Sequence, residues 1–495
     1  MANQQQQART ATLEELFKAE PDRLSRLSFE VAGLYFDLSK THLDGPVVER
    51  FLARAEEMGF DAARDALFSG QVVNLSEGRP ATHVAERGSG APEDVDLATA
   101  RRLRTRALVD AIEAGAFGDI TGVLHIGIGG SVLGPALLVD ALGLRSSKLE
   151  VRFLSNIDGA AFDDAVTTLD PATTLVVVAS KTFTTLETLS NFEAARQWLQ
   201  DAGVADPDGR FIAVTAAPEA ALEAGVDETR ILQFGEGVGG RYSLWSAVGV
   251  TAALALGWDA FEELLEGAAE MDRHFRFTQA ERNVPLIAAF ADRLYVEERG
   301  CQSRAVFAYD ERLRLLPFYL QQLEMESNGK SITKDGKAVD HPTAPITWGG
   351  TGTDAQHAVF QLLHQGTVLT PVEFVAVREA DDNQDPEHHR LLLLNAFAQG
   401  AALMQGRVSD DPQRSYPGNR PSSTILLDRL DARSLGALIS FYEHRTFANA
   451  VLLGINPFDQ FGVELGKLIA RQLAEGADEG SLDASTRALM DRARV

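Results

Sequence analysis

Two segments of the chain carry the residue types that bind phosphate groups. Gly127-Ile-Gly-Gly-Ser131 and Ser180-Lys-Thr-Phe-Thr-Thr185 each follow an apolar run and precede an expected helix. Glycines allow a tight turn close to a ligand, and the N–H groups at a helix start attract anions. The second segment adds hydroxyls and an ammonium group, more donors than a capping box of Thr184 and Glu187 would need. We therefore expect phosphate binding there, whereas the glycine segment alone could equally be a plain turn.

Carboxylates near the end of a predicted helix supply a candidate general base. The segment Gln322–Lys330 contains Glu324 and Glu326, which are two residues apart and cannot share a helical face. We expect one to be buried toward the site and the other to face solvent. Arg241 follows two glycines and could stabilise a developing oxyanion. Taken alone, these segments are more typical of an ordinary helix end and a surface arginine.

Two further segments contribute an imidazole and an ammonium group. His357 and His364 lie on one face of a predicted helix with Gln361 between them, but about 10 Å apart, too far to share a metal ion. Lys467 follows a bend that contains Gln460 and could point into a cleft. Taken alone, each segment is more typical of an ordinary polar helix.

The elements that must position these residues follow an alternating pattern. Short apolar runs separated by helical stretches predict a mainly parallel sheet covered on both faces, and ligands bind at the carboxyl ends of such strands. The strands expected in the first half are Val123–Ile126, Val151–Leu154, Thr174–Ala179 and Phe211–Val214. The helices expected beside them are Thr99–Ala114, Leu133–Leu144, Leu186–Ala202, Pro218–Ala224 and Ser243–Leu256.

A second α/β pattern occupies the other half of the chain. Its expected strands are Ala305–Ala308, Ile346–Trp348, Val372–Val377 and Val451–Ile455, and its expected charged loops are Glu379–His389 and Ser409–Ser423. The first hundred residues are expected to be mainly helix and loop, with helical spacing over Leu13–Ala19, Leu27–Leu38 and Pro46–Phe68. We therefore predict a helical region 1–100, α/β domains 101–260 and 261–470, and a helical tail 471–495.

Charge and cysteine content narrow the class of protein. Lys and Arg number 46 against 71 Asp and Glu, a net charge of −25, which disfavours nucleic acid and anionic membranes as partners. Cys301 is the only cysteine, so an intramolecular disulfide and a cysteine-based metal cluster are excluded. The start of the chain has no apolar signal region, and Ser243–Trp258 is too short and interrupted to cross a bilayer. These features indicate a soluble cytoplasmic protein.

Taken together, six segments resemble one family, the glucose-6-phosphate isomerases. GIGGS, SKTFTT-x-ET, GGRYSLWSAVG, MESNGK, Q-H-A-x-x-Q-L-L-H-Q-G and DQ-x-GVELGK occur in the order of that family, and matches extend from about Asn74 to Lys467. The resemblance implies two three-layer α/β/α sugar-isomerase domains with a helical arm and tail. It also implies interconversion of glucose 6-phosphate and fructose 6-phosphate through ring opening and a cis-enediolate, without a cofactor or metal.

The same resemblance assigns roles to individual residues. It implies that Glu326 moves the proton, that Arg241 stabilises the enediolate, and that His357 and Lys467 act in ring opening. The residues implied to bind substrate are Gly130, Ser131, Ser180, Lys181, Thr182, Thr185, Gln322 and Gln460. In this family the site forms at the interface of a homodimer, and the neighbouring subunit supplies the histidine.

Some positions depart from the family pattern, and two other functions remain open at this point. Asp354, Ala355, Pro457 and Phe461 stand where the family commonly has Asn, Gly, Ser and Trp. One alternative is a regulatory protein that binds sugar phosphates, which would need a phosphate loop but no base. The other is an isomerase that also accepts mannose 6-phosphate, because no motif reports the shape of the site near C2.

Overall fold

The computed structural model describes residues 11–143, 147, 149–474 and 482–494. The chain divides into two compact units, Met1–Pro457 and Phe458–Val495. The second unit contains helices α17 (Glu464–Ala474) and α18 (Ala484–Ala493). Both helices overlap the predicted helical tail, whose residues 475–481 and 495 lie outside the described part.

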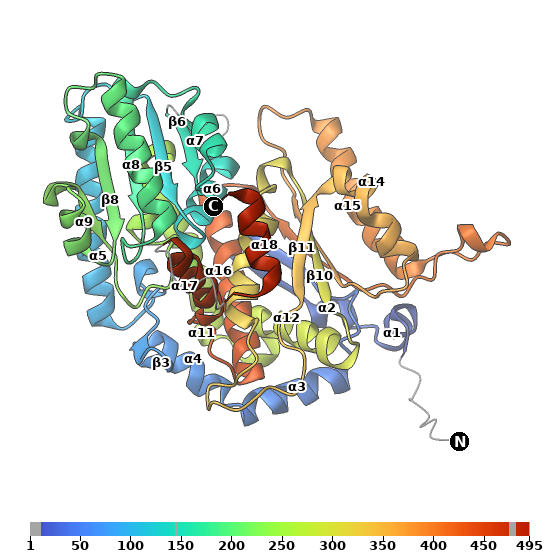
Figure 1. Ribbon diagram of the computed structural model, residues 1–495. Coiled ribbons are helices and arrows are strands. Elements are labelled where there is room, and N and C mark those ends of the chain that lie inside the picture. The colour runs from blue at the N-terminus through green and yellow to red at the C-terminus, as the bar shows by residue number, and fades with distance from the viewer. Residues whose placement is uncertain (1–10, 144–146, 148, 475–481, 495) are drawn as a thin grey trace. The chain divides into compact units, whose positions relative to one another are not determined.

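The first sheet of the larger unit is parallel and has the strand order β6-β5-β7-β8-β9. Its strands are β5 (Gly122–Gly127), β6 (Glu150–Leu154), β7 (Thr174–Ala179), β8 (Phe211–Thr215) and β9 (Ile231–Gln233). Around it lie α5 (Pro92–Glu113), α6 (Gly130–Gly143), α7 (Gly159–Val166), α8 (Leu186–Asp201), α9 (Pro218–Glu223) and α10 (Val250–Leu256) (Figure 1).

Alternation along β5 shows why helices cover both faces of this sheet. Leu124 and Ile126 pack with Phe192 and Leu199 of α8, whereas His125 points to the other face and contacts Thr251 of α10. All six residues of β5 are buried, as are all six of β7. A strand buried on both faces reads as a continuous apolar run, which is why these strands were predictable.

The second sheet has the strand order β1-β2-β13-β12-β10-β11. Its last four strands pair in parallel, and β2 of the hairpin β1–β2 pairs antiparallel to β13. Its strands are β1 (Ser28–Val31), β2 (Leu34–Asp37), β10 (Ser303–Tyr309), β11 (Ile346–Thr351), β12 (Val372–Val377) and β13 (Ser422–Leu427). One face packs on α14 (Gly352–Gln365) and α15 (Pro386–Gln405). The other carries α12 (Val284–Arg293) and α16 (Ala432–Leu453), so the mainly parallel α/β fold is confirmed.

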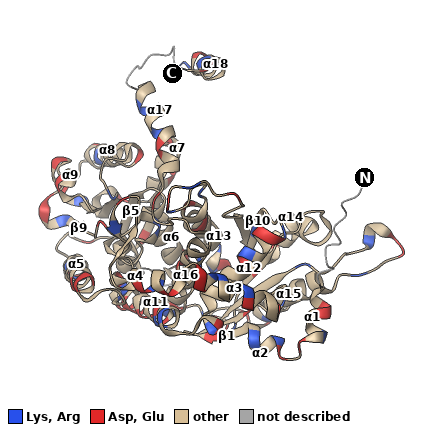
Figure 2. Ribbon diagram, turned by 90° about the horizontal axis from the view of Figure 1, so that it is seen from below, with Lys and Arg blue, Asp and Glu red and all other residues tan. Residues whose placement is uncertain are grey.

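Further elements complete the larger unit. They are α1 (Leu13–Ala19), α2 (Arg23–Leu27), α3 (Gly45–Glu57), α4 (Phe60–Phe68), α11 (Trp258–Phe277), α13 (Leu316–Leu320), and the short strands β3 (Val72–Asn74) and β4 (Arg79–Pro80). Two π-helical turns, Leu294–Glu298 and Gln321–Glu326, extend α12 and α13. Acidic and basic residues are interspersed along the helices of this unit (Figure 2).

The predicted helix over Leu27–Leu38 is wrong, because these residues form the hairpin β1–β2. Ala32 and Gly33 both have positive φ angles, 53° and 73°, as a two-residue hairpin turn requires. Buried and half-buried residues alternate along β2, the period of a strand. Two strands of the second sheet therefore come from the region that was predicted to be mainly helix and loop.

Two other predictions in the second half are also wrong. The expected strand Val451–Ile455 lies mostly in α16, a helix that is buried almost all round and therefore lacks helical alternation. The last parallel strand is β13 instead, which begins inside the expected loop Ser409–Ser423, and α15 begins inside the expected loop Glu379–His389.

The expected helix Ser243–Leu256 is shorter than predicted, because only its last seven residues form the α-helix α10. The domain boundaries at residues 100, 260 and 470 stay a prediction.

Candidate active site

The glycine segment forms the turn between β5 and α6 and touches two other predicted segments. Gly129 has a φ of +56°, and a Cβ there would lie 2.6 Å from Nε2 of Gln322. A Cβ on Gly130 would overlap the carbonyl group of Gly240 and the backbone nitrogen of Arg241. Both positions therefore require glycine, and the turn packs closely against the segments that contain Gln322 and Arg241 as well as connecting β5 to α6.

His125 supports this turn from inside the sheet, a role that sequence reasoning missed. Its Nε2 lies 2.8 Å from the carbonyl oxygen of Ser131, and its Nδ1 lies 2.7 Å from the hydroxyl of Thr251. Burial lowers the pKa of His125 to about 4, so the ring is neutral. Because a carbonyl only accepts, Nε2 carries the proton and Nδ1 accepts from Thr251. A histidine in the middle of an apolar strand was the available signal.

The second phosphate segment begins where β7 ends. The backbone N–H of Phe183 donates to the Ser180 hydroxyl over 3.2 Å, and Thr185 Oγ1 lies 3.4 Å from the same oxygen. Phe183 adopts a positive φ of 53° and buries its ring, while Thr182 and Thr184 remain exposed. The segment is thus a tight loop with hydroxyl groups ahead of α8.

Lys181 of this loop is held by the backbone of a neighbouring loop. Its ammonium group donates to the carbonyl oxygens of Glu236 at 2.7 Å and Val238 at 2.9 Å. Burial, together with the nearby Arg79, lowers the pKa of Lys181 to about 8. An ammonium group has three N–H donors, so one remains after these two bonds.

Arg241 is buried, with 3 % of its surface exposed, so the interpretation as a surface arginine is wrong. Its Nε donates to the Ser327 hydroxyl over 2.6 Å, and Nη2 donates to the carbonyl oxygen of Pro457. Its Nη1 lies 3.4 Å from Oε2 of Glu326. Pro457 stands where the family commonly has Ser, but this substitution leaves the contact intact because the carbonyl oxygen belongs to the backbone.

Glu326 lies at the end of the π-helical turn that continues α13. Gln322 donates from Nε2 to its Oε2 over 3.0 Å, and 22 % of the Glu326 side chain is exposed. Glu324 is buried and pairs with Arg304 and Thr347. The two carboxylates therefore separate as expected. The expectation that the buried one faces the site is wrong, because the buried Glu324 bonds to Arg304 and Thr347 and the more exposed Glu326 lies beside Arg241. Single π-helical turns are rare and are frequent at functional sites.

The contacts join four of the six predicted segments. Gln322 touches Gly129 and bonds to Glu326, Arg241 touches Gly130 and Glu326, and Lys181 bonds to the loop that leads to Arg241. A carboxylate, a guanidinium and two loops that carry glycine, hydroxyl and ammonium groups thus meet at the carboxyl ends of β5 and β7. This set can remove and return a proton beside a bound phosphate and stabilise a developing negative charge.

His357 lies elsewhere, on an exposed part of α14. It lines a surface groove of about 540 Å³ together with Gln361, His364 and Tyr416. Within the described part of the chain, its ring forms no hydrogen bond or ion pair with Glu326 or Arg241. The preceding Gln356 donates to the Tyr309 hydroxyl over 2.7 Å. One chain therefore does not bring His357 into contact with these two residues.

Gln460 and Lys467 belong to the smaller unit and are described only within it. Gln460 precedes a short 3₁₀ turn, Phe461–Val463, and Lys467 lies in the first turns of α17. The expectation that they line the site stays a prediction. Among the described residues there is no group of three His, Cys, Asp or Glu side chains arranged to hold a metal ion. No helix in the described ranges is long and apolar enough to cross a membrane.

Comparison with known proteins places these features in a family. The family model for phosphoglucose isomerase matches residues 37–490. The glucose-6-phosphate isomerase of Rhizorhabdus wittichii is 65% identical, over 97% of this chain and 96% of that protein. The protein of the same name from Zymomonas mobilis is 58% identical, over 97% of this chain and 94% of its own length.

Solved structures agree with this assignment. A glucose-6-phosphate isomerase from Chlamydia trachomatis superposes with a TM-score of 0.90 at 32% identity, covering 98% of this chain and 96% of that chain. A hypothetical protein from Thermus thermophilus shares the fold, with a TM-score of 0.69 at 24% identity over 89% of this chain and 99% of its own. Sequence match and fold similarity thus both extend over nearly the whole length, and the chain belongs to the phosphoglucose isomerase family of enzymes.

Proposed function

We propose that the chain interconverts glucose 6-phosphate and fructose 6-phosphate through ring opening and a cis-enediolate, as a step of glycolysis and gluconeogenesis. One observation carries the proposal: Gln322, Glu326 and Arg241 meet against the Gly129–Gly130 turn. Transfer of a proton between adjacent carbons needs a base and a group that stabilises the enediolate oxygens. The names of the relatives support the choice of substrate.

The phosphate group of the substrate is bound by the two loops at the ends of β5 and β7. The residues assigned to it are Gly130, Ser131, Ser180, Lys181, Thr182 and Thr185. The hydroxyls, the remaining N–H of the Lys181 ammonium and the start of α6 supply donors of the kind that phosphate oxygens accept. A phosphate held there supplies binding energy that positions the reacting carbons.

Glu326 acts as the base. Its carboxylate takes the proton from C2 of the open-chain aldose, electrons move from the C2–H bond to the C1 carbonyl, and the enediolate forms. The same carboxylate then returns the proton to C1, the proton of the C2 hydroxyl passes to the oxygen on C1, and the carbonyl group forms at C2. Arg241 stabilises the negative charge on the oxygens, and Gln322 orients the carboxylate through its bond of 3.0 Å.

His357, Lys467 and Gln460 complete the site in a homodimer. Ring opening needs a proton at the ring oxygen and the removal of one from the C1 hydroxyl, which suits an imidazole that titrates near neutrality. We assign this step to the histidine of a second copy of the chain and to Lys467, with Gln460 lining the site. The exposed position of His357 supports a site shared between subunits. The enzyme acts in the cytoplasm.

The function is tested by assaying purified protein with glucose 6-phosphate and, separately, mannose 6-phosphate, each with and without EDTA. We expect conversion of the glucose ester and full activity after chelation, because Glu326 and Arg241 supply both the base and the charge stabilisation. Absence of turnover would overturn the function. Loss of activity on chelation that a divalent ion restores would overturn the metal-free mechanism. The mannose arm measures how narrowly the enzyme selects at C2.

A further inference from the structure

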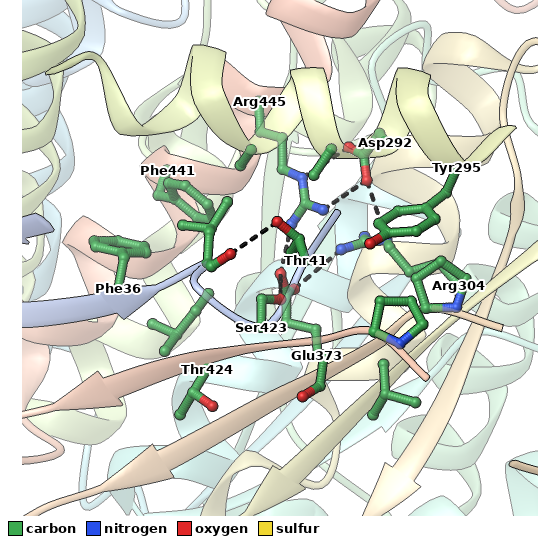
Figure 3. A pocket seen from close by; sticks show the side chains of 18 residues that line it. Phe36, Thr41, Asp292, Tyr295, Arg304, Glu373, Ser423, Thr424, Phe441 and Arg445 are labelled. Atoms are coloured by element: carbon green, nitrogen blue, oxygen red, sulfur yellow. Dashed lines mark hydrogen bonds and ion pairs between the residues drawn. The ribbon is translucent and has the colours of Figure 1, made fainter. Parts of the chain in front are cut away.

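A cluster of buried charges lies between the second sheet and helices α12 and α16. Arg304 of β10 bonds to Glu373 of β12 over 3.0 Å, and Arg445 of α16 bonds to the same carboxylate over 2.6 Å. Arg445 also forms two bonds to Asp292 of α12, of 2.7 and 2.8 Å. Figure 3 shows these four side chains pointing toward one another. The cavity beside them measures about 30 Å³, which holds a water molecule but not a sugar phosphate.

This cluster reaches the π-helical turn through one residue, Glu324. Its Oε1 pairs with Nη2 of Arg304, and its Oε2 accepts a hydrogen bond of 2.6 Å from the Thr347 hydroxyl of β11. Glu324 is buried, so both carboxylate oxygens are held by strands of the sheet. The turn is thereby fixed to the rigid centre of the second sheet.

Glu324 and Glu326 point in different directions from the same turn. Side chains two residues apart on a helix lie on nearly opposite faces, so fixing one sets the direction of the other. Beyond Glu326, Ser327 is held in turn, because Arg241 and Tyr242 both bond to its hydroxyl, over 2.6 and 2.9 Å. The segment around Glu326 is thus anchored on both sides.

A buried ion pair is a poor source of stability, because desolvation of the charges offsets most of their attraction. The buried pair of Glu324 and Arg304 is better explained if it orients the π-helical turn. We propose that Glu324, held by Arg304 and Thr347, is a positioning residue that sets the direction in which Glu326 faces the substrate. The inference rests on the proposed role of Glu326 as the base. Functional groups of this kind must be held to within about 0.5 Å, and an error of about 1 Å can cost roughly 100-fold in rate.

The first test compares two variants with the same chemical change. Glu324→Gln weakens the hold on the turn, and we expect kcat to fall about 10- to 100-fold while KM and inhibition by inorganic phosphate stay within about twofold. Glu373→Gln is the matched control, because Glu373 is also a buried partner of Arg304 but touches no residue of the turn. We expect it to lower Tm and to leave kcat within about twofold.

A milder pair of variants covers the case in which these proteins fail to fold. Thr347→Val removes only the hydroxyl that bonds to Glu324, and Thr105→Val removes a buried hydroxyl of α5 that bonds to the Arg101 carbonyl oxygen over 3.1 Å. We expect kcat to fall only in the first. If Arg304 acts through Glu324, the effects of Arg304→Lys and Glu324→Gln on kcat will also be non-additive.

Two results would overturn the inference: folded Thr347→Val or Glu324→Gln enzyme with unchanged kcat, or equal losses in the controls. Both differ from a failure of the proposed function, which would show as activity retained by Glu326→Gln.

Discussion

At the scale of single residues, the candidate site depends on which of two neighbouring side chains is buried and which stays accessible. Glu324 and Glu326 are chemically identical and nearly adjacent, yet one is bonded from the core and the other faces Arg241. Their spacing predicted that they would separate, and the family resemblance singled out Glu326, but only the structure shows that Glu324 is the buried one. Arg241 shows the reverse case, because spacing alone favoured a surface position and the structure buries it.

The proposed binding of phosphate by Lys181 predicts that substrate binding is sensitive to pH. Burial lowers the pKa of Lys181 to about 8, so its ammonium form is lost as the pH rises through that value. A sugar phosphate remains dianionic there, because its second pKa is about 6. We expect KM to rise between about pH 8 and 10, by at most about tenfold per pH unit. Initial rates of the wild-type enzyme and of Lys181→Met across this range measure the effect.

The variant serves as the control for this titration. Lys181→Met should have a raised KM already at pH 7, by roughly 10- to 100-fold, since a hydrogen bond to a charged group contributes about 1.5–3 kcal/mol. Its KM should not rise further with pH. A pH dependence identical in both proteins would show that Lys181 does not bind the phosphate group.

At the scale of elements, the parallel strands of the first sheet could be predicted and several other elements could not. β5 and β7 are continuous apolar runs and were predicted to within one residue at each end. The hairpin β1–β2 was not predicted, because the spacing of apolar residues in such short strands also fits a helix. The helix α16 was not predicted over its last residues, because a helix that is buried on all sides lacks the alternation of apolar and polar residues. The role of His125 was missed because its partners, Ser131 and Thr251, come together only through the fold.

The turn between β5 and α6 can be tested by adding one methyl group. Gly130→Ala would push the backbone of Gly240 and Arg241 away, because its Cβ would overlap the Gly240 carbonyl group. We expect a loss of about 1–3 kcal/mol in the free energy of unfolding and a lower kcat from the displaced Arg241. Denaturant unfolding and steady-state kinetics measure the two effects.

Gly159→Ala, at the start of α7, is the matched control. Nothing lies within 4 Å of the added methyl group, so stability should stay the same or rise by up to about 1 kcal/mol. If both variants behaved like the wild-type enzyme, the close approach of the glycine turn to Arg241 would be wrong.

At the scale of the whole molecule, the family assignment removes one of the alternatives left open by the sequence. The chain belongs to a family of isomerases over nearly its full length, which excludes a purely regulatory binding protein. Glu326, Arg241 and the loops that follow β5 and β7 come together within one chain, whereas His357 does not join them. The family resemblance implied that the histidine comes from a second copy of the chain. The spacing of the residues alone could not show it, because it depends on where α14 lies in the folded chain.

The shared site predicts recovery of activity when two inactive variants are mixed. In a hybrid dimer of Glu326→Gln and His357→Ala subunits, one site carries both lesions and the other has both residues intact. About half of the dimers in an equal mixture are hybrids, so about a quarter of wild-type activity should return. Each variant taken alone through the same subunit-exchange procedure is the control. No recovery after verified subunit exchange would mean that each chain supplies its own histidine.

The proposed transfer of the proton by Glu326 can be followed as hydrogen exchange at C2 of the sugar. Incubation with glucose 6-phosphate in D₂O, followed by NMR, measures exchange for the wild-type enzyme, Glu326→Gln and the surface control Glu193→Gln. We expect Glu326→Gln to slow both exchange and turnover by at least roughly 10²–10⁴-fold, with inhibition by inorganic phosphate unchanged, because an amide keeps the shape but cannot accept the proton. Exchange at the wild-type rate in Glu326→Gln would show that another group carries the proton.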